Sequence, residues 1–327
     1  MMIFLSRLLL LLVASAAALP AQKIRIGLIG LDTSHVIAFT SLLNEEQNPS
    51  HIPGATVTAA YKGGSLDIPS SINRVSGFTK TLTEKYGVRI YDNIPDMCNE
   101  VDAILLTSLD GRTHLEQIKP VLAAGKPVFI DKPLAGSLKE AVKIFQLAKK
   151  AGVPCFSSSS LRWHPGVMEV ANADAGDIRS AISYGPAFSE PHHPSLFWYG
   201  IHATESLFTV MGPGCQSVVA TETKNTIVVT GKWKDDRIGI LHGIRNGKTS
   251  FKVTAFGTEA IVEQASGGNY APMLREIVKF FQTGKPPVPA VITLELYAFM
   301  EAADESIRRG GTPISLPEYL RNNGWPR

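Results

Sequence analysis

The sequence lacks several features that define specialised classes of protein. It has three cysteines in 327 residues and no C-x-x-C pair, which excludes a disulfide-rich scaffold and offers no zinc-site spacing. Lysines and arginines are scattered and the net charge is +3, so nothing indicates a nucleic-acid partner. No low-complexity tract interrupts a composition that is 44% hydrophobic and 19% charged, which is typical of a globular chain with room for two domains.

A long hydrophobic run is also missing. The apolar stretch Leu8–Leu19 has 12 residues, fewer than the roughly 20 that cross a bilayer. Arg7 precedes it and small residues follow, so residues 1–21 are expected to be a signal peptide cut after Ala18 or Ala21; an uncleaved anchor is the alternative. We expect an exported protein, periplasmic or extracellular, with no membrane span after cleavage and with its cysteines buried as core thiols.

From residue 23 to 160, short apolar runs alternate with helical patterns, which predicts βαβ units and a parallel sheet. Strands are expected at 23–30, 56–61, 101–108, 126–133 and 153–160. Helices are expected to follow Thr33 or Ser34, to run over 114–124, and to begin at Ser137 and end before Gly152. The fold class is therefore α/β, with an N-terminal Rossmann-type doubly wound sheet.

After residue 161 the pattern changes to β-rich runs joined by Asn-Gly turns, which predicts a mostly antiparallel sheet. Two late helices are expected over 273–283 and 293–309. We divide the chain into a nucleotide-binding domain at 22–160, an α+β substrate domain at 161–290, and a C-terminal segment at 291–327 that packs back on the first domain.

The first strand leads into an incomplete dinucleotide fingerprint. The motif G-x-G-x-x-G keeps its first glycine as Gly30, but Asp32 and His35 stand at the second and third glycine positions. A carboxylate at position 32 repels a diphosphate unless its side chain turns away. The second strand ends in Tyr61 and Lys62 where an acidic ribose ligand is expected, and Lys62 weakly favours a 2′-phosphate.

Three motifs together resemble the Gfo/Idh/MocA family of oxidoreductases. A strand ends in Asp131-Lys132-Pro133, close to the family's E-K-P, and a histidine, His114, follows the preceding strand. The stretch 160–165 resembles the entry to the family's second domain, and the stretch 293–316 resembles its last helix. The likeness covers nearly all of the chain after residue 22.

The resemblance implies a nicotinamide cofactor, NAD or NADP, and a sugar or cyclitol substrate. Lys132 and His202 would move the hydroxyl proton beside Asp131, because a buried lysine amine exchanges protons near neutral pH. The candidate cofactor-binding residues lie in the fingerprint turn and after the fourth strand: Gly30, Leu31, Asp32, Thr33, Ser34, Thr107, Ser108 and His114.

The second-domain motif D-x-G-x-H appears with Trp198 in place of its aspartate, followed by Gly200 and His202. Without that carboxylate, Glu205 could orient His202 if the segment is helical. Trp198 and Tyr199 offer flat surfaces to a sugar ring, and Arg162 and Glu205 complete the substrate candidates. A structural role for His202 and a plain surface turn at 131–133 stay open.

Two other functions remain as alternatives. One is a nicotinamide-independent lyase or hydrolase acting on carbohydrate, and the other is a sugar-binding protein without turnover. Both are favoured by the altered fingerprint and by an export signal that lacks a twin arginine, because a chain exported unfolded carries no cofactor. No metal is assigned, although His192, His193 and His202 could bind one with Glu190, Glu205 or His35. Self-association through the C-terminal sheet is expected.

Overall fold

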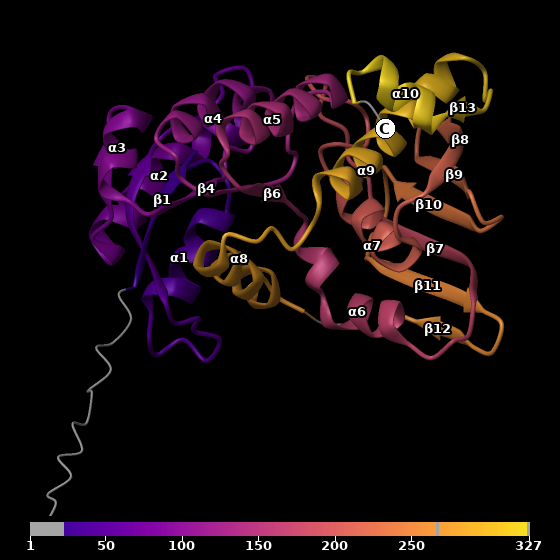
Figure 1. Cartoon of the computed structure of the whole chain (residues 1–327), viewed down its shortest axis with the longest axis horizontal. Helices are drawn as coiled ribbons and strands as arrows, with labels where there is room; N and C mark the ends of the chain where they lie inside the picture. The colour runs from indigo at the N-terminus through magenta and orange to yellow at the C-terminus, as the bar shows by residue number, and fades with distance from the viewer. Residues whose placement is uncertain (1–22, 266–267, 326–327) are drawn as a thin grey trace, which may run out of the picture.

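The computed structural model describes residues 23–265 and 268–325 (Figure 1). The predicted signal peptide lies outside the described residues. Two halves, each built on one sheet, stand side by side along the long axis of the molecule (Figure 1). In the described part of the chain, no helix combines the length and apolarity that a membrane crossing requires.

The first half contains a six-stranded, all-parallel sheet in the order β3-β2-β1-β4-β5-β6. Its strands are largely buried on both faces, except for the edge strand at residues 89–91, as expected when helices cover both sides of a parallel sheet. The strands are β1 (Ile24–Ile29), β2 (Ala55–Tyr61), β3 (Arg89–Tyr91), β4 (Ala103–Leu106), β5 (Val128–Ile130) and β6 (Cys155–Ser157).

The helices of this half are α1 (His35–Asn44), α2 (Pro69–Tyr86), α3 (Ile94–Glu100), α4 (His114–Ala123) and α5 (Leu138–Ala151). The predicted strands, the helix after Ser34, the helix from His114 and the helix after Ser137 are all present. Ser137 caps α5 by accepting a hydrogen bond from the Glu140 amide, and Gly152 ends it in the left-handed conformation. The sequence analysis missed α2, β3 and α3.

The second half contains a seven-stranded sheet in the order β12-β11-β7-β10-β9-β8-β13, in which only the β7–β10 pair is parallel. The mostly antiparallel sheet predicted after residue 161 is thus confirmed. Its strands are β7 (Ile178–Pro186), β8 (Cys215–Thr223), β9 (Thr226–Trp233), β10 (Ile238–Ile244), β11 (Lys252–Gly257), β12 (Ile261–Glu263) and β13 (Ile314–Ser315).

Five further α-helices and two 3₁₀ turns complete the described chain. The helices are α6 (Pro165–Asn172), α7 (Ile201–Met211), α8 (Ala271–Thr283), α9 (Ala290–Arg308) and α10 (Leu316–Asn322), and the turns are η1 (Gly111–Thr113) and η2 (Ser160–Trp163). Helix α8 packs on the first sheet, where Phe280 meets Phe156 with ring centroids 5.0 Å apart. Helix α8 therefore follows the strands β7–β12 of the second half in the sequence but lies against the first half (Figure 1).

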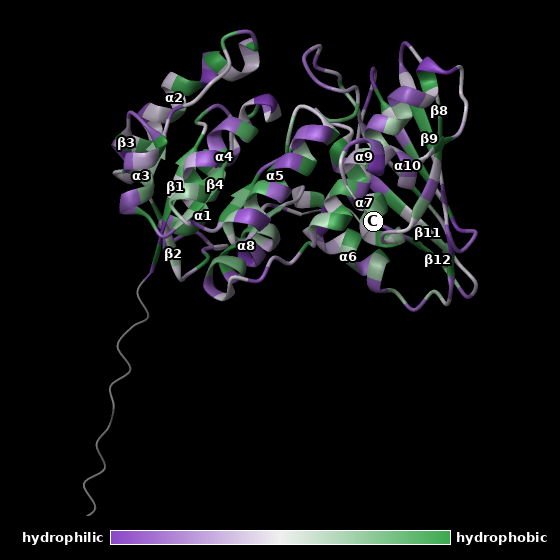
Figure 2. Ribbon diagram, turned by 45° about the horizontal axis from the view of Figure 1, so that its top comes forward, coloured by the Kyte–Doolittle hydropathy of each residue, from purple (hydrophilic) through white to green (hydrophobic). Residues whose placement is uncertain are grey.

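Helix α9 connects the two halves. The Tyr297 hydroxyl accepts a hydrogen bond from the Leu134 amide, beside the end of β5, and Glu301 accepts one from Leu138 at 3.1 Å. On the other side, Ser306 accepts a hydrogen bond from Ala220 of β8 at 3.0 Å. A buried apolar stripe along α9 continues the core from one half into the other (Figure 2). The two sheets therefore hold a fixed geometry around the segment after β5.

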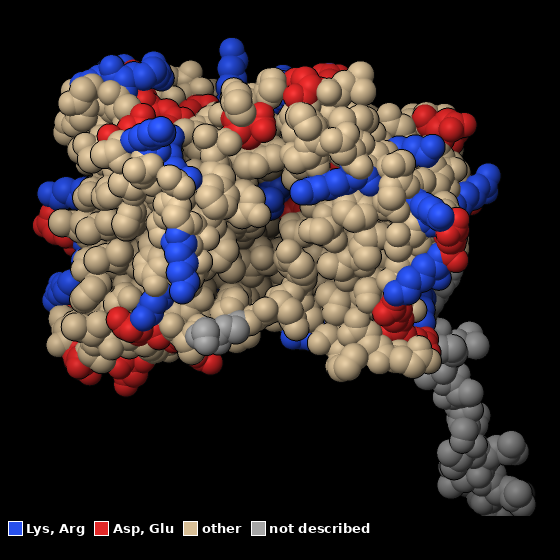
Figure 3. Space-filling model, turned by 180° about the vertical axis from the view of Figure 1, so that it is seen from behind, with Lys and Arg blue, Asp and Glu red and all other residues tan. Residues whose placement is uncertain are grey.

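The surface and the cysteines agree with the composition. Cys98, Cys155 and Cys215 are all buried, as expected for core thiols. Lysines, arginines and acidic residues are interspersed over the face seen in Figure 3.

Candidate functional site

A cavity of about 170 Å³ lies where the carboxyl ends of β1, β4 and β5 face the second half. Because strand order reverses between β1 and β4, this edge is the topological switch point, where open α/β sheets bind ligands. The cavity walls come from the turn before α1 and its first residue, the start of α2, the segments after β4 and β5, the residues that lead into α7 and its first turn, and the residue before α8. Its volume is below the roughly 300–1,000 Å³ that drug-sized ligands occupy.

Lys132 lines this cavity directly after β5. The preceding residue, Asp131, is 2% exposed and accepts hydrogen bonds at both carboxylate oxygens. Its Oδ1 accepts from the Lys132 amide at 2.8 Å, and its Oδ2 lies 2.5 Å from Nδ1 of His35 on α1. This double anchor fixes the backbone from which the lysine side chain extends.

Burial and neighbouring charges set the protonation of these groups. Burial alone would raise the pKa of Asp131, but His35 and Lys132 together outweigh it and hold that pKa below its usual value. For Lys132, burial lowers the pKa most, the nearby charge of Arg74 lowers it further, and Asp131 opposes both. The lysine amine is therefore easier to deprotonate than a surface lysine, as a general base requires.

His202 lies in the first turn of α7 and also lines the cavity. Its Nδ1 is 2.6 Å from the Ser159 hydroxyl, which orients the ring. Burial, Lys132 and His35 hold the pKa of His202 well below 6.5, so the imidazole is neutral near pH 7. The proposed orientation of His202 by Glu205 is wrong, since Glu205 binds Arg162 instead.

The aromatic candidates line the cavity and the charged substrate candidates do not. Trp198 and Tyr199 form its wall, and the Tyr199 ring centroid lies 6.0 Å from Lys132 Nζ. Arg162 and Glu205 form a buried ion pair with each other behind the wall, and Ser158 donates a weak hydrogen bond to Glu205 at 3.5 Å. The pair positions the start of α7 against η2, away from the cavity.

Most of the candidate cofactor residues are engaged within the fold. Gly30 has φ +89°, and a Cβ there would lie 2.4 Å from Ser108 backbone atoms, so the turn needs glycine. Thr107 donates its hydroxyl to the Gly30 carbonyl at 2.9 Å, and Ser108 donates to Gln117 at 2.8 Å. His114 lies with both ring nitrogens beside carbonyl oxygens, of Leu134 and Ser108. These contacts hold β1, β4 and β5 together at the switch point.

The segment 62–71, which includes the start of α2, lies across the crevice between β1 and β4. Leu31 donates its amide to the Lys62 carbonyl at 2.6 Å, so β1 and β2 keep pairing past their ends. Asp32 is fully buried; one carboxylate oxygen accepts from the Ser71 hydroxyl at 2.6 Å and the other from the Leu109 amide at 3.0 Å. Burial raises the pKa of Asp32, although both hydrogen bonds act against this.

A second group of hydrogen bonds and ion pairs holds the segment 62–71 against the residues that follow β4. The Ser65 hydroxyl donates to Asp110 at 2.6 Å, and the Ser65 amide donates to the Ser71 hydroxyl at 2.8 Å. Arg112 bridges Asp67 and Asp110, with distances of 2.9 and 2.8 Å. The crevice that takes a pyrophosphate in Rossmann-type proteins is thus filled by this chain's own hydrogen-bonded residues.

A pyrophosphate reaches this turn only if the segment 62–71 moves. The amide of Leu31 and the side chain of Asp32 are committed to the segment 62–71, and the open space beside them is the 170 Å³ cavity. Of the eight candidate cofactor residues, Thr33 and Ser34 line that cavity. The assignment of the others to cofactor binding stays a prediction that requires the segment 62–71 to move.

The histidines considered as metal ligands do not come together. His193 lies 3.2 Å from Asp110, and His192 lies 2.7 Å from Glu190 and 3.5 Å from Asp67. Within the described residues, no group of three His, Cys, Asp or Glu side chains has a geometry that could hold a metal ion.

Sequence reasoning missed Leu109, which follows β4, and three other contributors to the cavity. Ser70 and Arg74 come from the unpredicted helix α2, and Tyr270 comes from the residue before α8. The Tyr270 ring packs edge-on against His35 with centroids 4.7 Å apart. A helix signal was present at Pro69, since proline is favoured in the first turn, but the polar composition of α2 concealed its apolar face.

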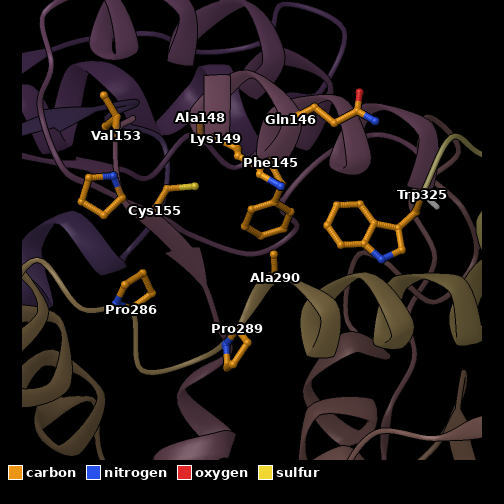
Figure 4. A pocket seen from close by; sticks show the side chains of 11 residues that line it. Phe145, Gln146, Ala148, Lys149, Val153, Cys155, Pro286, Pro289, Ala290 and Trp325 are labelled. Carbon is orange, nitrogen blue, oxygen red and sulfur yellow. The ribbon is translucent and has the colours of Figure 1, made fainter. Parts of the chain in front are cut away.

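A larger cavity of about 580 Å³ lies elsewhere, between α5, the start of β6 and the segment that joins α8 to α9 (Figure 4). Phe145, Cys155, Pro289 and Trp325 form part of its wall. It opens at the amino end of β6, opposite the edge that carries Lys132. In parallel sheets, ligands bind at the carboxyl edge, so size alone does not make this cavity the active site.

Comparison with known proteins supports the class that this geometry defines. Residues 59–159 match the GFO_IDH_MocA family model, described as an oxidoreductase family with an NAD-binding Rossmann fold. Inositol 2-dehydrogenase of Paracoccus denitrificans is 39% identical over 122 residues, 36% of each chain. A dTDP-3,4-didehydro-2,6-dideoxy-alpha-D-glucose 3-reductase of Actinomadura kijaniata is 30% identical over 118 residues, 35% of each chain. The chain thus matches about a third of the length of these curated relatives.

Solved structures share the fold over almost the whole chain. The apo scyllo-inositol dehydrogenase of Lactobacillus casei superposes with a TM-score of 0.75 at 17% identity, covering 91% of this chain and 99% of that one. A second structure of that enzyme, with bound NAD(H) and scyllo-inositol, gives a TM-score of 0.74 at 16% identity and covers 90% and 99%.

Fold and site together define a Rossmann-type protein with a second, mostly antiparallel sheet domain. The match to the family model over residues 59–159 and the shared fold confirm the resemblance to Gfo/Idh/MocA oxidoreductases found in the sequence.

Proposed function

We propose that this protein is an oxidoreductase that acts on a hydroxyl-bearing carbon of a sugar or cyclitol ring. The single observation that carries the proposal is the cavity where Lys132 and a neutral His202 meet between aromatic walls, at the carboxyl edge of the sheet. The family model and the inositol dehydrogenase relatives support this substrate class and an NAD-type cofactor. The test includes both NAD and NADP, because Lys62 at the end of β2 weakly favours a 2′-phosphate.

In this proposal the chain's own residues handle the proton. The Lys132 amine takes the proton of the ring hydroxyl, because its pKa is lowered, and Asp131 stabilises the ammonium that forms. His202 donates a hydrogen bond from Nε2, since its Nδ1 is occupied by Ser159. Trp198 and Tyr199 pack against the apolar faces of the ring.

The second candidate is acid–base chemistry on a carbohydrate without a nicotinamide. The specific observation in its favour is the segment 62–71, which fills the dinucleotide crevice and occupies Leu31 and Asp32. Lys132 and His202 keep the same roles in this candidate. Export, which we also propose from the N-terminal sequence, favours it because free dinucleotide is scarce outside the cytoplasm; cell fractionation with a tagged full chain tests the export.

Native mass spectrometry of residues 22–327, titrated with NAD(H) and NADP(H), separates the two candidates. Saturable binding supports the oxidoreductase, and sugars and cyclitols are then screened by the absorbance of reduced nicotinamide. No binding at millimolar dinucleotide overturns it in favour of the second candidate. In either case Lys132→Ala is expected to lower turnover about 100-fold or more, whereas Lys139→Ala, an exposed neighbour, retains it.

A further inference from the structure

The cavity carries positive charge without a carboxylate at its surface. Lys132 and Arg74 both line it, and none of its lining residues is an aspartate or glutamate. Asp131 lies behind Lys132 and is paired with His35. For a neutral polyol, the second cation would act only through its effect on the pKa of Lys132.

Arg74 has no acidic partner of its own among the described residues. Every ion pair found there involves another arginine, lysine or histidine, and no hydrogen bond from the Arg74 guanidinium to a side chain is present. Yet Arg74 is near enough to Lys132 to lower its pKa. Arg74 is an exposed residue that lines the small cavity, and its unpaired guanidinium, with five donors, suits a planar carboxylate.

The turn before α1 adds further donors on the same side. Thr33 and Ser34 line the cavity, and within the described residues no acceptor is hydrogen-bonded to either of their amides. Ser34 is the N-cap of the ten-residue helix α1 and Thr33 precedes it, so both amides lie beside a helix N-terminus, which favours negative charge. Arg74, Thr33, Ser34 and Lys132 therefore line one small space, and they come from α2, the turn before α1 and the segment after β5.

We propose that Arg74 and the Thr33 and Ser34 amides form an anion subsite, and that the substrate is a sugar acid whose carboxylate binds there. The ring of such a molecule would lie between the subsite and the Tyr199 side, with a hydroxyl at Lys132. The inference deepens the proposed function by naming the substrate class, and it rests on that function only for the chemistry at Lys132. Arg74 thereby becomes a determinant of specificity.

A pyrophosphate is also an anion that these donors could bind. Two observations favour the carboxylate. The cavity volume of about 170 Å³ suits one small ring compound, and the crevice that would continue it towards β2 is closed by the Asp32–Ser71 hydrogen bond. The experiment therefore includes both sources of the anion.

Matched sugars test the subsite directly by isothermal titration calorimetry on residues 22–327. The probes are glucuronate against glucose and galacturonate against galactose. At least one uronate is expected to bind about 10-fold or more tightly than its neutral partner, because a charge-assisted pair contributes in that range. Arg74→Gln is expected to abolish the preference, whereas Lys80→Gln, an exposed cation on the same helix, retains it.

Three outcomes overturn the proposal. The first is that neither uronate binds saturably or that neutral sugars bind equally well. The second is that the preference survives Arg74→Gln. The third is that inorganic pyrophosphate or NAD displaces the uronate and itself loses affinity in Arg74→Gln, which assigns the arginine to a cofactor. Lys132→Ala separates this inference from the proposed function. If the variant still binds uronate and its turnover is unchanged, the proposed function is contradicted and the subsite is not.

Discussion

At the scale of single residues, the site depends on how Lys132 is held between opposing charges. Asp131 and Arg74 act on its pKa in opposite directions, and burial adds to the effect of Arg74. Asp131 is itself fixed by His35, so the residue at the third fingerprint position supports the backbone of Lys132, the base in the proposed function. His35 thus has a structural role of its own, in addition to replacing a glycine of the fingerprint.

This arrangement predicts two opposite shifts in the titration of Lys132. Arg74→Gln removes a charge that lowers its pKa, so that pKa rises. Asp131→Asn removes the charge that raises it, so that pKa falls. Competitive acetylation of the neutral amine across a pH series, read by mass spectrometry of the peptide containing Lys132, measures both shifts.

Exposed Lys139 in the same chain serves as the internal control, and its reactivity should not change between variants. Thermal unfolding of each variant checks that the fold is retained. Shifts in the same direction for both substitutions would contradict the electrostatic account of this lysine.

At the scale of elements, the deciding structure is the helix that the sequence analysis missed. The strands around it were predictable because parallel strands are continuous apolar runs, and α5 was predictable from Ser137 and Gly152. Helix α2 buries Ser71, Val75 and Leu82 among polar residues, so its periodicity is weak in sequence. Its contact with Asp32 is long-range, and no local pattern announces such a pairing.

The same reasoning explains which parts of the site were found. Lys132, His202, Trp198 and Tyr199 lie in short motifs next to element ends, where a family resemblance places them. Arg74 reaches the cavity from an element with no motif. The pairing of Arg162 with Glu205 could not be read from residues 43 positions apart in the chain.

The buried Asp32 is expected to hold the segment 62–71 in the crevice. Asp32→Gly restores the fingerprint glycine and removes the acceptor of two hydrogen bonds, from Ser71 and Leu109. We expect a loss of about 1–3 kcal/mol in the free energy of unfolding, faster amide exchange across 62–71, and tighter binding of dinucleotide. Hydrogen–deuterium exchange and the native mass spectrometry titration measure these changes.

Ser71→Ala should give the same changes in smaller measure, because it removes one of those hydrogen bonds. Ser70→Ala is the matched control, since Ser70 lines the cavity and its hydroxyl has no bond to Asp32. Unchanged exchange over 62–71 in Asp32→Gly would show that other contacts, such as the Arg112 bridge, hold the segment.

At the scale of the whole molecule, the second sheet has one covered and one open face. Helices α7 and α9 pack on the face that carries Gly239 and Leu241, while Ile238, Ile240 and His242 alternate onto the other face. Register places Ile182, Ile240, Thr230 and Val219 in one row across β7, β10, β9 and β8. Each residue of that row is at least partly exposed.

Three of the four residues in this row are apolar, and we expect the row to pair with a second copy of the chain, because exposed apolar patches mark interaction sites. A C₂ dimer would place the same row on both copies, far from Lys132 on the opposite side of α7. Ile240→Lys introduces a charge at the centre of the row and should shift the protein towards monomer. Light scattering after size-exclusion chromatography, over a range of concentrations, measures the shift.

Leu66→Lys makes the same change at a side chain that is 86% exposed and away from the sheet, so it should leave the mass unchanged. The affinity for a sugar at Lys132 should be equal in both variants, because each copy of the chain builds its cavity from its own residues. A wild-type protein that stays monomeric at the highest concentration would refute this use of the open face.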